Sequence, residues 1–146
     1  MSQSLIRIGV TGSGFMGRTH VEAARRAPGA EIVAVAGGRR APGLADDYGI
    51  DCVETVEELI RREDIDASIS STPHHCHIDE TLLAAECGTH VLVEKPIALT
   101  SWDATRMVRA AKRYDRHLMV AHVLPFFPEY AWLAETIEAG TYGDCH

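Results

Sequence analysis

The strongest constraint on this chain is a glycine pattern between residues 6 and 20. An apolar segment rich in β-branched residues, residues 6–10, leads into Gly12-x-Gly14-x-x-Gly17, and helix-compatible residues follow. This order predicts a strand, a tight turn and a helix. Gly12 allows the turn, Gly14 lets a pyrophosphate approach bare backbone, and Gly17 lets the helix pack closely on the strand. The pattern therefore predicts a dinucleotide-binding site, with a plain glycine-rich turn as the alternative.

Composition narrows the class of protein. The 146 residues are enough for one well-buried domain, and a formal charge of −7 argues against nucleic acid, which is bound by clustered Lys and Arg. No apolar run approaches the roughly 20 residues of a membrane span. The N-terminus lacks the basic segment, apolar core and cleavage site of an export signal. We therefore expect a cytoplasmic protein that binds neither nucleic acid nor membrane.

Strand-like and helix-like segments alternate from Leu5 to Ala121. Beyond the first unit, the pattern predicts strands at 31–36, 52–53, 67–71, 90–93 and 117–121, and helices at 44–48, 55–62, 78–87 and 100–114, with a last helix at 129–139. Acidic residues in the first turn of the 78–87 helix, Asp79 and Glu80, suit the helix dipole. Alternation of this kind is typical of an α/β fold with a doubly wound parallel sheet, the Rossmann fold.

The loop after the second strand indicates which cofactor is bound. NAD-selective sites usually carry Asp or Glu there, to accept hydrogen bonds from the ribose 2′-hydroxyl. This chain has Gly37-Gly38-Arg39-Arg40 instead. Without a carboxylate to repel a 2′-phosphate, and with two guanidinium groups to bind one, the loop favours NADP over NAD. Solvated loop arginines are the alternative.

The fourth strand ends at Thr72-Pro73, and the segment His74-His75-Cys76-His77 follows. Three imidazoles and a thiol in four residues suggest zinc, but neighbouring side chains diverge, and structural zinc sites draw their ligands from two separated segments. We therefore predict no metal site and expect a loop that faces the cofactor.

The fifth strand ends in Glu94-Lys95-Pro96. Two opposite charges at the carboxyl end of a buried strand are unusual. If this end faces the cofactor, Lys95 can place a cation beside the reacting carbon, where negative charge develops on oxygen during hydride transfer. A surface ion pair is the alternative.

Three motifs in this order resemble the N-terminal domain of the glucose–fructose oxidoreductase, inositol dehydrogenase and rhizopine-catabolism (Gfo/Idh/MocA) oxidoreductases. They are Gly12-x-Gly14-x-x-Gly17-x-x-His20, Thr72-Pro73 with His77 four residues after the proline, and Gly88-x-His90-Val-Leu-Val-Glu-Lys-Pro96. The resemblance implies an NAD(P)-binding Rossmann domain over residues 1–122, then a connecting helix and the start of a truncated substrate domain over 123–146. One departure is Pro125-Phe126, where the family often has Arg-Phe.

The resemblance also assigns roles to single residues. It places the pyrophosphate of the cofactor against Gly12, Gly14, Phe15 and Met16, and the adenosine ribose against Gly37, Gly38, Arg39 and Arg40. It places the nicotinamide side along Thr72, Pro73, His77 and Glu94. Lys95 matches the family lysine that binds the reacting hydroxyl or carbonyl and is the predicted catalytic residue.

By resemblance, the parent protein is an NAD(P)-dependent dehydrogenase or reductase that transfers a hydride between nicotinamide and a sugar, polyol or related hydroxy or keto substrate. A cofactor-sensing regulator of the same fold is an alternative, which the intact Glu94-Lys95-Pro96 disfavours. A methyltransferase is disfavoured because it would need an acidic residue where Gly37 and Gly38 stand. The family's remaining catalytic residues and its oligomer interface lie in the second domain. We therefore expect a homo-oligomer formed through that domain, and a fragment that is inactive alone.

Overall fold

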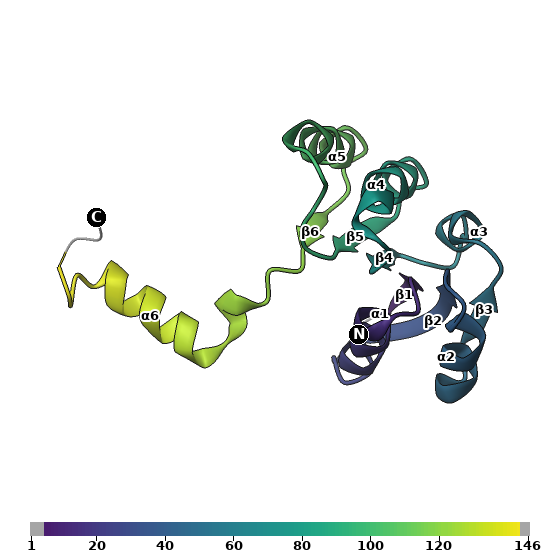
Figure 1. The fold of residues 1–146 in the computed structure, drawn as a ribbon, viewed down its shortest axis with the longest axis horizontal. Coiled ribbons are helices and arrows are strands. Elements are labelled where there is room, and N and C mark those ends of the chain that lie inside the picture. Colours follow the sequence, from purple (N-terminus) through teal and green to yellow (C-terminus); the bar gives the residue numbers. More distant parts are fainter. Residues whose placement is uncertain (1–4, 144–146) are drawn as a thin grey trace.

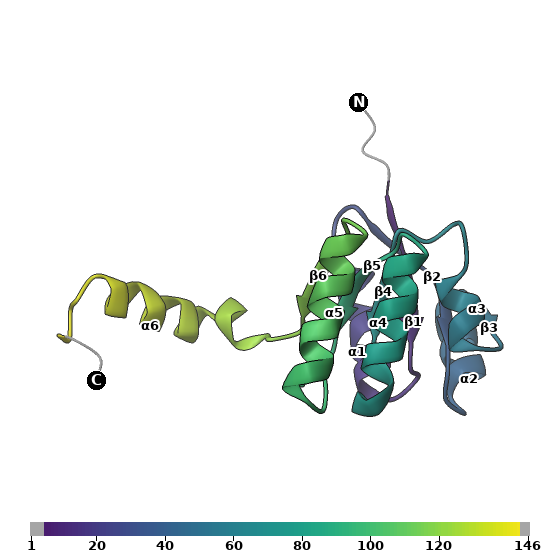
Figure 2. The same ribbon diagram turned by 90° about the horizontal axis from the view of Figure 1, so that it is seen from above.

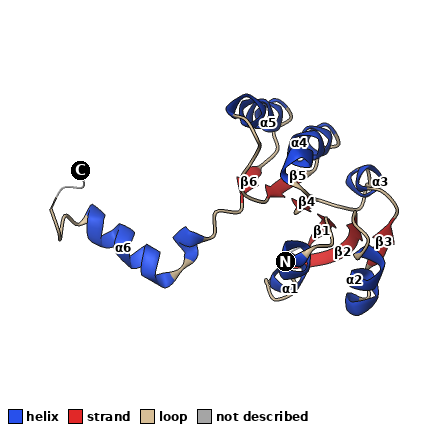
Figure 3. Ribbon diagram, viewed as in Figure 1, coloured by secondary structure: helices blue, strands red, loops and turns tan. Residues whose placement is uncertain are grey.

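The computed structural model describes residues 5–143 and contains one six-stranded sheet. Its strands, in the spatial order β3-β2-β1-β4-β5-β6, are all parallel (Figure 3). They are β1 (Ile6–Thr11), β2 (Ala30–Ala36), β3 (Asp51–Val53), β4 (Ala67–Ser70), β5 (His90–Val93) and β6 (Leu118–Val120). This order confirms the predicted doubly wound α/β fold.

The helices cover both faces of the sheet. One face carries α1 (Phe15–Ala24) and α2 (Ala41–Tyr48), and the other carries α3 (Val56–Ile60), α4 (His77–Glu86) and α5 (Ser101–Arg113) (Figures 1 and 2). Short 3₁₀ turns, η1 (His74–Cys76) and η2 (Leu124–Phe126), precede α4 and the last helix, α6 (Pro128–Glu138). Each parallel connection crosses over the sheet through a helix, as parallel strands require.

Two apolar cores result, because successive strand side chains point to opposite faces. Under α1 and α2 the buried cluster includes Val10, Val21, Val35, Leu44 and Ile69. Under α3, α4 and α5 it includes Leu59, Ile60, Ala84, Val93 and Met107. With both faces covered, the strands are apolar on both sides, which explains their nearly continuous hydrophobic sequence.

Helix ends follow local chemistry. The predicted capping box at the start of α3 is present, since Glu58 N donates to Thr55 Oγ1 at 3.1 Å and Thr55 N donates to Glu58 Oε2 at 3.3 Å. The prediction that α2 begins at residue 44 was wrong. The helix begins at Ala41 and takes Pro42 into its first turn, where a proline removes only an N–H that has no partner within the helix.

After β6 the chain leaves the sheet, and α6 leads away from it (Figure 1). Large apolar side chains of this helix are exposed, among them Tyr130, Trp132, Leu133 and Ile137. The domain boundary predicted after residue 122 lies where the chain leaves the sheet, between β6 and α6. That residues 123–146 begin a second domain stays a prediction, and residues 144–146 lie outside the described part of the chain.

An arginine pair at the amino edge of the sheet predicts a pH effect on stability. Arg62 Nε lies 2.8 Å from Asp64 Oδ1 and Arg7 Nη2 lies 2.7 Å from Asp64 Oδ2. These bonds hold the pKa of Asp64 well below its usual range. The stabilisation of the fold by these ion pairs is therefore complete at neutral pH and is lost as the pH falls through the depressed pKa of Asp64.

We expect Asp64→Asn to lower the free energy of unfolding at pH 7 by no more than about 1 kcal/mol, because the side chain is 42% exposed. The difference in the free energy of unfolding between this variant and the wild type should become smaller as the pH falls below the ordinary aspartate pKa. Urea unfolding of both proteins at pH 7 and at acidic pH measures this difference, with Glu63→Gln as an exposed control. A difference that grows at acidic pH would contradict the stabilising role of Asp64.

Candidate functional site

The predicted site residues gather at one edge of the sheet. Because all six strands are parallel, the loops that follow them lie at the same, carboxyl edge. The predicted site residues in these loops are Gly12–Gly14 after β1, Gly37–Arg40 after β2, Thr72–Pro73 after β4 and Glu94–Lys95 after β5. The chain winds outward in opposite directions from β1 and β4, and ligands of open α/β sheets bind at such a switch point.

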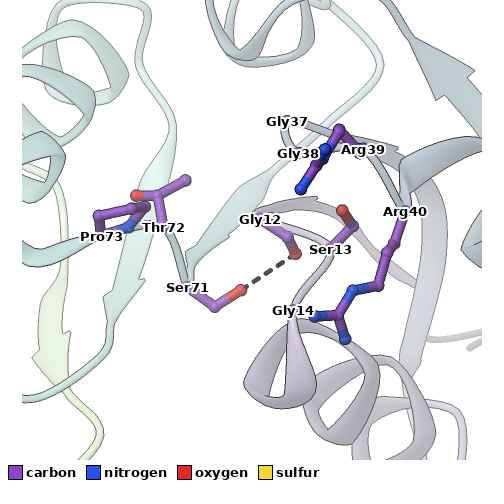
Figure 4. A pocket seen from close by; sticks show the side chains of 10 residues that line it. All are labelled: Gly12, Ser13, Gly14, Gly37, Gly38, Arg39, Arg40, Ser71, Thr72 and Pro73. Carbon is purple, nitrogen blue, oxygen red and sulfur yellow. Dashed lines mark hydrogen bonds between the residues drawn. The ribbon is translucent and has the colours of Figure 1, made fainter.

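A cavity of about 620 Å³ opens at this switch point (Figure 4). Most predicted cofactor residues line it, namely Gly12, Gly14, Gly37, Gly38, Arg39, Arg40, Thr72 and Pro73. Phe15 and Met16 lie at the start of α1 and are not among the lining residues. Ser13 and Ser71, which were not predicted from the sequence, also line the cavity.

Two of the three motif glycines are required by the backbone. Gly12 has a φ of +90°, and a Cβ there would lie 2.6 Å from the carbonyl oxygen of Ser71. A Cβ on Gly17 would lie 2.0 Å from the carbonyl oxygen of Gly12. The predicted tight turn at Gly12 is confirmed, and Gly17 packs against that turn.

Gly14 differs, because a Cβ there would meet no atom within 4 Å. It is the exposed N-cap of α1, and no side chain caps this helix end. Bare backbone beside unpaired amides at the positive end of a helix fits the diphosphate of a dinucleotide. The residues present therefore fit the cofactor that the glycine pattern predicts.

The opposite walls of the cavity differ in charge. Arg39 and Arg40 come from the loop after β2, across the cavity from Thr72 and Pro73 (Figure 4). Both arginines are exposed, and within residues 5–143 neither guanidinium forms a hydrogen bond or an ion pair. No acidic residue is among those lining the cavity. This wall can therefore bind an additional phosphate.

Lys95 lies beside a second cavity of about 570 Å³, also at the carboxyl edge. Its other lining residues follow β6 and are mostly apolar: Ala121, His122, Val123, Leu124 and Pro125. Lys95 is exposed, and its backbone N–H donates to Glu94 Oε2 at 3.0 Å. An apolar wall around one cation suits a reaction that develops negative charge on a ligand oxygen.

Glu94 and His77 are placed differently from the other predicted residues. The Glu94 carboxylate is buried, and His20 Nε2 of α1 lies 2.8 Å from its Oε1. His77 is completely buried, with Nδ1 3.1 Å from the carbonyl oxygen of Pro96 and Nε2 3.1 Å from that of Thr72. The Glu94 carboxylate is thus held by His20 and the Lys95 amide, and the His77 ring lies between the loops that follow β4 and β5. Contact of either side chain with a cofactor stays a prediction.

Glu80 belongs to a buried hydrogen-bond network that was not predicted from the sequence. We expected this residue to suit the helix dipole, yet its side chain lies inward and accepts hydrogen bonds from Thr11, Ser70 and Thr72. No sequence signal marks this contact, since the partner hydroxyls belong to strand ends up to 69 residues away.

The imidazole-rich segment is divided between two elements. His74, His75 and Cys76 form the η1 turn, and His77 begins α4. Among residues 5–143, no three His, Cys, Asp or Glu side chains are grouped so that they could hold a metal ion.

Within residues 5–143, no helix combines the length and apolar character needed to cross a membrane.

Comparison with known proteins decides the family. Residues 6–122 match the Gfo/Idh/MocA model, described as an oxidoreductase family with an NAD-binding Rossmann fold. The chain belongs to this family. The membership agrees with the resemblance drawn from the three motifs and with the NAD(P)-binding geometry of the first cavity.

Members of the family are similar over nearly the whole chain. The chain is 32% identical to inositol 2-dehydrogenase of Corynebacterium glutamicum, covering 99% of this chain and 44% of that protein. It is 36% identical to 1,5-anhydro-D-fructose reductase of Ensifer adhaerens, covering 94% and 42%. A solved NAD-binding oxidoreductase from Klebsiella pneumoniae matches with a TM-score of 0.86 at 30% identity, covering 95% and 40%. The chain thus spans less than half the length of these relatives.

Proposed function

We propose that the full-length protein is an NAD(P)-dependent oxidoreductase acting on a sugar, a polyol or a related hydroxy or keto compound. One observation carries the proposal: the bare backbone at Gly14 and the ammonium group of Lys95 lie at the same edge of the sheet. The names of the inositol dehydrogenase and anhydrofructose reductase support the substrate class. A purely regulatory protein would have less need of Lys95.

In this proposal the chain holds the cofactor and polarises the substrate. The amides at the start of α1 bind the diphosphate, and the loop Gly37–Arg40 binds the adenosine ribose. When bound, the nicotinamide ring supplies a donor or acceptor for hydride. Lys95 donates a hydrogen bond to the oxygen on the reacting carbon and stabilises its developing negative charge. A residue of the second domain handles the proton, so this chain alone is expected to be inactive.

For the choice of cofactor we propose NADP. The support is the wall formed by Arg39 and Arg40, whose guanidinium groups have no protein partner among residues 5–143. A 2′-phosphate would give both groups a charged acceptor, whereas the 2′-hydroxyl of NAD would not.

Replacing both arginines should therefore separate the two cofactors. We expect Arg39→Ala plus Arg40→Ala to weaken NADPH binding by about tenfold or more, since hydrogen bonds to charged groups contribute roughly 1.5–3 kcal/mol each. NADH binding should change by less than about threefold, because those bonds are absent with NAD. Fluorescence titration of the full-length protein measures both affinities.

A charge-matched control removes two exposed arginines elsewhere, Arg26→Ala plus Arg109→Ala, and should leave both affinities unchanged. Unchanged NADPH affinity in the Arg39 and Arg40 variant would contradict a 2′-phosphate site. An equal loss for NADH and NADPH would do so too.

The remaining assignments are proposals of the same kind. We propose a small-molecule substrate bound between this domain and a second one, and a homo-oligomer formed through that second domain. A cytoplasmic location stays a prediction.

A further inference from the structure

Glu80 stands out because it is a buried carboxylate held only by hydroxyl groups. Its side chain belongs to a residue that is 8% exposed, and within residues 5–143 it forms no ion pair. Thr11 Oγ1 lies 2.6 Å from Oε2, Thr72 Oγ1 lies 2.6 Å from Oε1, and Ser70 Oγ bonds Oε2. One side chain of α4 therefore joins the ends of β1 and β4.

These contacts fix the direction of each hydrogen bond. A carboxylate only accepts, so every hydroxyl that meets it must donate its single proton. Thr72 Oγ1 consequently has no proton left for a ligand and offers only lone pairs. Thr72 is also the one hydroxyl donor of this network that lines the 620 Å³ cavity.

A second side chain of the same helix turn holds Thr72. The completely buried ring of His77 places Nε2 3.1 Å from the Thr72 carbonyl oxygen. The backbone and the hydroxyl of Thr72 are thus both held by the first turn of α4, which leaves little freedom for the residue to reorient.

We propose that Glu80 is a positioning residue that makes the hydroxyl of Thr72 an obligatory hydrogen-bond acceptor for the bound dinucleotide. The group that meets Thr72 is then a donor, either the carboxamide nitrogen or a ribose hydroxyl. This inference rests on the proposed function, because it requires a dinucleotide in the cavity. Glu80 acts only through Thr72 and touches no ligand itself.

The test is a double-mutant cycle on NADPH affinity in the full-length protein. In Glu80→Gln the amide nitrogen can only donate, and it displaces one donor at the Oε1 position but two at the Oε2 position, so the Thr72 hydroxyl is the one that must reverse and accept. We expect Glu80→Gln and Thr72→Val each to weaken NADPH binding by about tenfold, the upper range for one hydrogen bond. The double variant should be no weaker than either single one, because both changes remove the same interaction. Thr72→Ser should retain wild-type affinity.

Ala84→Gly tests whether a general loss of fold stability would by itself weaken NADPH binding. Ala84 is a buried residue of α4 four positions after Glu80, and the change lowers helix stability without touching the network. It should lower the melting temperature and leave NADPH affinity within about twofold, less than the loss of one hydrogen bond. The inference would be overturned if the losses of NADPH affinity in Glu80→Gln and Thr72→Val added up in the double variant. It would also be overturned if Glu80→Gln bound NADPH as tightly as the wild type. Either result leaves the proposed function intact. A wild-type protein that binds neither NADPH nor NADH would overturn both.

Discussion

Replacing Lys95 with methionine in the full-length protein should reduce turnover by at least about 10²- to 10³-fold, the loss expected when one donor to a developing oxyanion is removed. Methionine has an unbranched apolar side chain of similar length but no ammonium group, so the change removes the charge together with the hydrogen-bond donors. Lys95 is exposed at the second cavity, and its side chain forms no ion pair within residues 5–143. The folded domain should therefore be little affected by the change.

The measurement pairs steady-state rates with NADPH titration, using the sugar or polyol that the wild-type protein turns over fastest. NADPH affinity should stay within about fivefold, because a single hydrogen bond contributes only about 1 kcal/mol. Lys112→Met, at an exposed lysine of α5, is the matched control and should leave both quantities unchanged. Loss of cofactor binding together with turnover would show that Lys95 has a structural role instead.

The second large effect should separate two glycines of the same motif. In Gly17→Ala the new Cβ would lie 2.0 Å from the Gly12 carbonyl oxygen, which is backbone and has little room to move. Overpacking of this kind costs about 3 kcal/mol, and the better helix propensity of alanine returns only about 1 kcal/mol. We therefore expect a clear fall in melting temperature and in the midpoint of urea unfolding.

Gly14→Ala should behave in the opposite way. Its Cβ meets nothing within 4 Å and its φ is −76°, so the cost to stability should stay below about 1 kcal/mol, that of a poorer N-cap. Cofactor affinity should nevertheless fall, because the methyl group occupies the surface where phosphate meets bare backbone. A Gly14→Ala protein that binds NADPH as tightly as wild type would contradict the placement of the diphosphate.

The sequence was sufficient for features encoded by neighbouring residues. The glycine turn, the Thr55 capping box and the proline-terminated strands could be predicted because each depends on residues within a few positions of one another. The common edge of the strand ends followed from alternation alone, since a parallel sheet places all carboxyl ends together. Element ends were less certain, as the inclusion of Pro42 in α2 shows.

The supporting contacts of the site could not be predicted. Glu80 and Thr11 are 69 residues apart, and His20 and Glu94 are 74 residues apart, so each pair meets only because the sheet brings distant segments together. A buried Glu80 cannot be distinguished from a solvent-facing one by sequence, because an acidic residue in a first helical turn is favourable on either face. His77 was placed beside the nicotinamide by the family resemblance, and its burial depends on a contact with Pro96, 19 residues away.

The position of β1 has a practical consequence. This strand starts at Ile6 at the amino edge of the sheet and reaches the cavity only at Gly12, after six residues. Six extended residues span roughly 20 Å. A coupling group introduced immediately before Ile6 would therefore join the molecule at the end of the central strand that lies opposite the cavity.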